Sequence, residues 1–160
     1  MDSLVEIYLE RANNEIMAAE SLKRLSEQNE DKKNFDLPLN ISFYSSVISH
    51  SYYAIFYSTK ALLLTKNIKT SSPEVHKKTF EEFKKNFADA GILDVSLLKI
   101  YNKMMIRADE LLQIFKDERW KRGYFTYQTI PQANKPYADE SIKHSKFFVS
   151  NIMKVIKDKE

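Results

Sequence analysis

Residues 42–64 constrain the fold more than any other part of the chain. They read SFYSSVISHSYYAIFYSTKALLL and contain no acidic residue, no glycine and no proline. A run of this length is too long for one strand, and as a helix it lacks a continuous charged face. A helix that is apolar or small on nearly every side must be covered by other helices. We therefore expect this segment to be the central helix of an all-α fold.

Small side chains form a narrow stripe along this expected helix. Ser51, Ala54, Ser58 and Ala61 recur at helical spacing and share one face. Small residues let a neighbouring helix approach closely. The rest of the chain is expected to wrap this segment, either alone or together with a second subunit.

Composition agrees with one helical domain spanning residues 1–160. Two glycines and four prolines in 160 residues leave little material for turns, so the elements must be long. The absence of cysteine excludes disulfides, thiolate metal ligands and a cysteine nucleophile, and it suits a reducing cytoplasm. The first residues, with early acids and no apolar run, do not resemble a signal peptide. Six serines, four tyrosines, a histidine and a lysine in residues 42–64 argue against a membrane span. We expect a cytoplasmic protein.

Helix-start and helix-stop signals divide the chain into about five helices. A first amphipathic helix is expected from Asp2 to about Leu25. Later starts are expected at Ser42, at the capping box Ser71-Ser72-Pro73-Glu74, at Asp94 and near Asp139. Gly91 is the expected stop before Asp94. The sequence predicts an up-and-down helical bundle.

Two stretches depart from helical periodicity. Residues 26–40 are polar and contain Leu37-Pro38, so we expect a surface connection of ragged order. Residues 120–137 hold Gly123, two prolines and five aromatic residues, which predicts a long irregular loop. Long loops in compact domains are often functional.

Few residues of the sequence indicate a catalytic, metal or ligand-binding site. The three histidines are far apart, and neither a metal-binding cluster nor a glycine-rich phosphate loop occurs, so we expect no metal and no cofactor. His76 shares a helix face with phenylalanines, which fits a half-buried core histidine or a histidine at an interhelical cleft. Cations and aromatic residues alternate in Lys116–Tyr127, a mixture that suits a nucleotide or single-stranded nucleic acid. The simpler interpretation is a helix end with solvated cations.

These segments, in this order, resemble the HEPN superfamily, in particular its small stand-alone prokaryotic members. The resemblance rests on four pieces: Ser51-Tyr52-Tyr53-Ala54 with Phe56 and Lys60-Ala61-Leu62-Leu63; His76, Phe80 and Phe87 before Gly91-Ile92; Arg119 through Arg122-Gly123-Tyr124; and Ala138-Asp139-Glu140 with Phe147-Phe148. It covers about residues 40–155. The first piece is the most specific. Arg122 and Gly123 stand where the family pattern has Ala-Asp.

The resemblance implies a homodimeric helical bundle, often paired with a small nucleotidyltransferase in a toxin–antitoxin system. The superfamily's ribonucleases carry an arginine four to six residues before a histidine. Neither His50, His76 nor His144 has an arginine at that spacing. The resemblance therefore implies no catalytic residues here.

The leading hypothesis is a non-catalytic HEPN module that binds a nucleotide, RNA or a nucleotidyltransferase partner. Its candidate binding residues are Arg119, Lys121, Arg122, Tyr124, His76 and Tyr53. One alternative is a metal-independent ribonuclease that uses Arg119 and a histidine brought close by folding. The other is a structural oligomer with no ligand.

Overall fold

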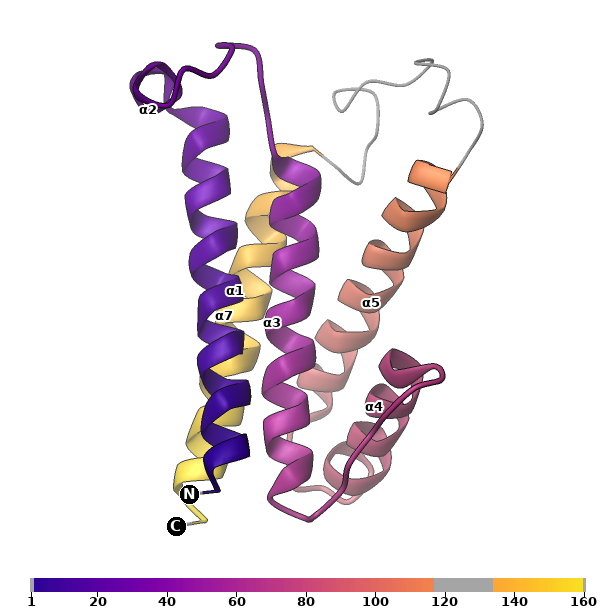
Figure 1. The fold of residues 1–160 in the computed structure, drawn as a ribbon. Coiled ribbons are helices and arrows are strands. Elements are labelled where there is room, and N and C mark those ends of the chain that lie inside the picture. The colour runs from indigo at the N-terminus through magenta and orange to yellow at the C-terminus, as the bar shows by residue number, and fades with distance from the viewer. Residues whose placement is uncertain (1, 117–133, 160) are drawn as a thin grey trace.

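The computed structural model describes residues 2–116 and 134–159, and within them the chain is a bundle of helices (Figure 1). The described elements are α1 (Ser3–Glu27), α2 (Asn29–Asn34), α3 (Tyr44–Leu64), α4 (Val75–Phe83), a π-helical segment η1 (Lys84–Ala88), α5 (Val95–Lys116) and α7 (Lys135–Lys157). No strand occurs in these residues. The all-α expectation is confirmed.

Helix α3 is the centre of this bundle. It packs against α1 and α7 along its length and also contacts α4 and α5 (Figure 1). Fourteen of its 21 residues are buried, so partners cover it on most sides. The prediction of an enclosed central helix is therefore confirmed.

The small stripe on α3 lies where three helices meet. Ser51, Ala54, Ser58 and Ala61 are all fully buried. Ala54 packs against Ala12 of α1 and Val149 of α7. The two serine hydroxyls donate hydrogen bonds to carbonyls of α3 itself, so their burial leaves no polar group unsatisfied.

The predicted capping box before α4 is wrong. Glu74 has a left-handed backbone (φ 55°), and the Ser72–Pro73 peptide bond is cis. A residue with a left-handed backbone cannot belong to the first turn of a right-handed helix. The helix therefore begins at Val75, without a side-chain cap.

The turn that follows the π-helical segment matches its sequence signals. Gly91 adopts φ 71°, and the Ile92 amide donates to the Phe87 carbonyl at 2.9 Å. The Ser96 amide then donates to Asp94 Oδ1 at 2.7 Å. Gly91 as the stop and Asp94 as the cap of α5 are both confirmed.

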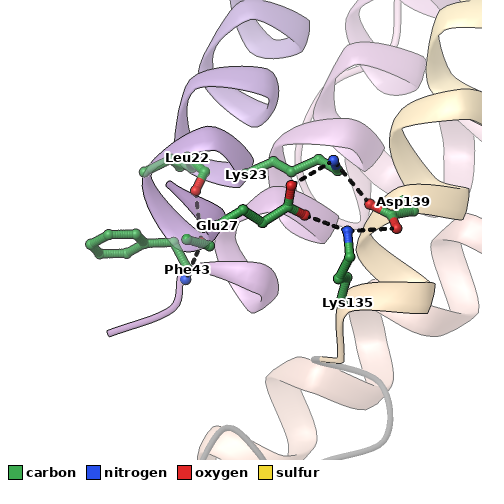
Figure 2. Close-up of polar contacts among 7 residues, drawn as sticks. Leu22, Lys23, Glu27, Phe43, Lys135 and Asp139 are labelled. Atoms are coloured by element: carbon green, nitrogen blue, oxygen red, sulfur yellow. Dashed lines mark hydrogen bonds and ion pairs between the residues drawn. The ribbon is translucent and has the colours of Figure 1, made fainter. Parts of the chain in front are cut away.

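The connection from α1 to α3 is more ordered than its sequence suggested. It contains α2, and the buried ammonium of Lys32 donates to the Leu39 carbonyl at 2.8 Å. Ser26 Oγ accepts a hydrogen bond from the Phe43 amide at 2.7 Å and donates to the Leu22 carbonyl (Figure 2). These long-range bonds tie down the chain ahead of α3, so the expected ragged order is corrected.

Helix α7 begins at Lys135, four residues before its predicted start at Asp139. A network of four salt bridges connects its first turn to α1 (Figure 2). Lys135 lies 2.6 Å from Glu27 and 3.2 Å from Asp139, and Lys23 lies 3.1 Å from Glu27 and 3.3 Å from Asp139. Because both acids contact both lysines, the network favours a helical first turn here.

Candidate functional site

A cleft of about 590 Å³ opens between α3, α4 and α5. Figure 1 shows α5 diverging from α3 toward the end where α3 begins. The cleft is lined by Ser49, Tyr52 and Tyr53 of α3, His76 and Lys77 of α4, and Met105, Ile106, Ala108, Asp109, Leu111 and Leu112 of α5. Its size is that of a small-molecule site, and its lining is mostly apolar with a few polar groups.

His76 is fixed at the α3 side of this cleft. Its Nδ1 lies 2.8 Å from the Tyr52 hydroxyl. Its ring stacks on Phe56 at a centroid distance of 4.2 Å, and the Tyr53 ring meets it edge-on at 5.9 Å. Three side chains of α3 thus hold one imidazole in a defined orientation.

The electrostatics of this pair define which groups carry protons. Burial lowers the pKa of His76, and the positive charge of Lys60 lowers it further. Burial raises the pKa of Tyr52. Tyr52 therefore stays protonated, and its hydroxyl can donate a hydrogen bond to Nδ1 of a neutral imidazole. In that arrangement the proton of His76 is on Nε2, which is then a hydrogen-bond donor.

The rim of the cleft combines an aromatic face, apolar side chains and two opposite charges. Tyr53 is 38% exposed, and Ile106 and Leu112 are each 49% exposed. Lys77 and Asp109 supply the charges. Flat aromatic surface beside hydrogen-bonding groups is suited to a planar heterocycle.

Comparison with known proteins assigns the chain to a family. The family model described as "HEPN domain" matches residues 5–156. The chain belongs to the HEPN domain family. The HEPN resemblance stated from the sequence motifs is thereby confirmed.

Two relatives come from Methanocaldococcus jannaschii. The protein named "Putative toxin MJ0605" is 30% identical over 115 residues, which are 72% of this chain and 72% of that protein. The protein named "Putative toxin MJ0142" is 41% identical over 64 residues, 40% of this chain and 42% of that protein. A search of solved structures found no significant match.

In this HEPN chain, the structure brings two of the six candidate residues together. His76 and Tyr53 both line the cleft and contact each other. Arg119, Lys121, Arg122 and Tyr124, like most of the loop predicted at 120–137, lie outside the described residues.

The candidate residues predicted from the sequence did not include Tyr52, which lines the cleft, or Phe56, on which His76 stacks. Tyr52 and Phe56 lie one helical turn apart on α3, a spacing that could have marked them as a pair that holds an aromatic ring. The contribution of α5 had no local signal, because Met105, Ile106 and Leu112 are ordinary apolar residues of an amphipathic helix.

The other histidines lie apart from the cleft lining. His50 Nδ1 lies 2.5 Å from Glu15, which links α3 to α1. His144 Nδ1 lies 3.9 Å from Glu140, whose carboxylate also accepts from Arg107 at 2.9 Å. The fold thus brings an arginine and a histidine to one carboxylate. Arg107 is only 5% exposed and also donates to Ser141 Oγ, so its guanidinium is occupied by the protein itself.

Two classes of site receive no support from the described part of the chain. No group of three acidic, histidine or cysteine side chains there is arranged to hold a metal ion. None of the described helices combines the length and the apolar character needed to cross a bilayer.

Acid should destabilise the fold through His76 and His144. Burial lowers the pKa of both below the ordinary value near 6.5, although Glu140 partly opposes this at His144. Below about pH 6.5 the unfolded chain binds protons at these histidines more readily than the folded chain does. The contribution of the two neutral histidines to stability is therefore present above about pH 6.5 and is lost as pH falls. The urea midpoint should drop between pH 7.5 and 5.5. His76→Gln and His144→Gln should each reduce that drop, and an unchanged drop in both would contradict this origin.

Proposed function

We propose that this HEPN-domain protein is a non-catalytic, homodimeric module that binds a nucleotide or RNA as part of a toxin–antitoxin-like system. The observation that carries the proposal is the cleft in which Tyr52 and Phe56 orient His76 beside the exposed ring of Tyr53. The names of the two relatives from Methanocaldococcus jannaschii, both of which include the word toxin, support the toxin–antitoxin setting.

The cleft offers what a nucleobase requires. The Tyr53 ring provides a stacking surface, and such stacking contributes roughly 1–3 kcal/mol per base. A neutral His76 with its proton on Nε2 can donate to a ring nitrogen or a carbonyl oxygen of the base. Lys77 on the rim provides a positive charge that attracts an anionic nucleotide or RNA toward the cleft.

The missing arginine–histidine sequence motif supports a binding role. No arginine precedes any histidine by four to six residues. Within residues 2–116 and 134–159, Arg107 and His144 both contact Glu140, and Arg107 is buried by its own contacts. An arginine held in this way cannot turn toward a scissile phosphate without breaking three hydrogen bonds.

The proposed dimer and a nucleotidyltransferase partner need a surface, and α5 offers one. On this helix Val95 is about half exposed, and so are Ile106 and Leu112 at the rim of the cleft, so a partner bound here would also border the cleft. Exposed apolar side chains on one helix are suited to a protein interface. A small nucleotidyltransferase would be the partner protein in this system, recovered with the chain in a pull-down from its native host.

Nucleotide binding tests the proposal directly. We expect AMP, or a short single-stranded RNA, to bind the wild-type chain in isothermal titration calorimetry. Tyr53→Ala and His76→Ala should each weaken binding by about tenfold, because each removes a contact of 1–3 kcal/mol. Phe147→Ala is the matched control, since it removes an exposed aromatic ring of α7 that does not line the cleft.

Two outcomes would replace the proposal. Equal affinities in all three variants would place the ligand elsewhere, and no binding of AMP or RNA would favour a structural oligomer. The ribonuclease alternative predicts RNA cleavage in EDTA that Arg119→Ala abolishes. Intact RNA after long incubation would exclude that alternative.

A further inference from the structure

A second, smaller pocket lies at the other end of α3. It has a volume of about 210 Å³ and is lined by Leu4 and Tyr8 of α1, Lys60, Leu63 and Leu64 of α3, and Ile68, Lys69, Thr70 and Ser71 of the following turn. This volume is below the range of about 300–1,000 Å³ that is usual for whole small-molecule ligands. The pocket is therefore suited to one group of a ligand.

The charges of the lining are unbalanced. Lys60 and Lys69 contribute two positive charges, and no acidic residue lines the pocket. By contrast, Lys77 is accompanied by Asp109 in the large cleft, and a pocket beside α1 and α7 combines its cations with Glu20, Glu27 and Asp139. Two lysines without a neighbouring carboxylate favour an anion between them.

The ammonium of Lys60 is fixed in place. Its Nζ donates to the Thr70 carbonyl at 3.2 Å and lies 5.1 Å above the Tyr8 ring. That single hydrogen bond uses one of three protons, so two remain for a ligand. Because the Lys60 side chain is already held by the Thr70 carbonyl, it loses little further conformational entropy when an anion binds.

The Thr70 hydroxyl is committed elsewhere. Thr79 Oγ1 donates to the Val75 carbonyl, so in the 2.7 Å contact between the two threonines Thr70 is the donor. The charged donors for an anion in this pocket are the two lysines, and the Ser71 and Tyr8 hydroxyls also belong to its lining.

Lys60 also connects this pocket to the large cleft. Its Nζ lies 5.7 Å from the centroid of Phe56, the ring on which His76 stacks, and its charge helps to lower the pKa of His76. The small pocket and the imidazole are thus neighbours across one lysine and one phenylalanine.

We propose that the pocket between Lys60, Lys69 and Tyr8 binds a phosphate group of the ligand whose base occupies the His76 cleft. This inference rests on the proposed nucleotide-binding function and adds the position of the phosphate. The group is a phosphate monoester or diester. It can come from a free mononucleotide or from the 5′ end or backbone of RNA.

Calorimetry with AMP and with adenosine separates the phosphate from the base. Lys60→Gln and Lys69→Gln should each weaken AMP binding by about tenfold, the effect of one charge-assisted hydrogen bond, and leave adenosine binding unchanged. Lys66→Gln is the matched control. Lys66 also donates to a backbone carbonyl and lies over an aromatic ring, but it does not line the pocket. Thermal unfolding of each variant measures any loss of structure.

Inorganic pyrophosphate separates this proposal from the proposed function. Pyrophosphate binding that Lys60→Gln weakens would support the phosphate pocket even if adenosine failed to bind. The proposal would be overturned if Lys60→Gln weakened the binding of AMP and of adenosine equally. It would also be overturned if neither lysine variant changed the binding of AMP or of pyrophosphate. A 5′-phosphorylated hexanucleotide that binds more tightly than its 5′-hydroxyl form would identify an RNA end, and equal binding with lysine dependence would identify the RNA backbone.

Discussion

Replacing Arg107 with methionine should lower the free energy of unfolding by about 3 kcal/mol. This guanidinium is buried between α5 and α7, where it donates to Glu140 at 2.9 Å and to Ser141 Oγ at 3.0 Å. It also lies 4.7 Å over the Tyr137 ring. Methionine keeps the apolar stem but removes every one of these contacts and leaves part of the Glu140 carboxylate without its donor. Urea denaturation at pH 7.5 measures the loss.

Lys103→Met is the matched control for that experiment. Lys103 lies one turn earlier on α5 and pairs with the same carboxylate, but its side chain is half exposed. Exposed ion pairs contribute about 0–1 kcal/mol, so this variant should lose far less stability. Similar losses in the two variants would show that burial of Arg107 is not the source of its effect.

An Ala54→Leu variant should lose about 3 kcal/mol, through overpacking. Ala54 is fully buried where α3 meets Ala12 of α1 and Val149 of α7. A larger side chain there must push two helices away from α3, which also loosens the contacts of Ser51 and Ser58 on the same stripe. Denaturation should show a lower midpoint, and near-ultraviolet circular dichroism should show weaker tyrosine signals.

The control for overpacking adds the same side chain where there is room. Asn14 is exposed on α1, and Asn14→Leu should change stability by less than about 0.5 kcal/mol, because leucine is a good helix former. If Ala54→Leu unfolds at the same urea concentration as wild type, α1, α3 and α7 are packed less tightly than the structure indicates.

The central helix was predictable because its signal is compositional. No arrangement of Tyr44–Leu64 leaves a polar face for water, so enclosure by other helices follows from the residues alone. The cap at Asp94 and the stop at Gly91 were predictable for a similar reason, since each depends on a local property of one residue. Signals of this kind do not require knowledge of distant parts of the chain.

The errors arose where distant contacts decide the local structure. The start of α7 is fixed by Lys135, which bonds with Glu27 of α1, and the connection before α3 is ordered by the hydrogen bonds of Ser26 and Lys32. The start of α4 depends on the left-handed backbone of Glu74, and a glutamate in the sequence does not predict that conformation. The His76 cleft was predicted in part, since its residues from α3 and α4 carry aromatic signals and its residues from α5 do not.

The central position of α3 has a consequence for how the chain acquires its structure during synthesis. Helices α1 and α3 lie close in sequence and can pair early, but α7, which covers the same small-residue face, is the last described helix to leave the ribosome. Until it arrives, the groove beside Ala54 is open to water and to other chains. The nascent protein therefore carries an exposed seam beside Ala54 until α7 packs against it.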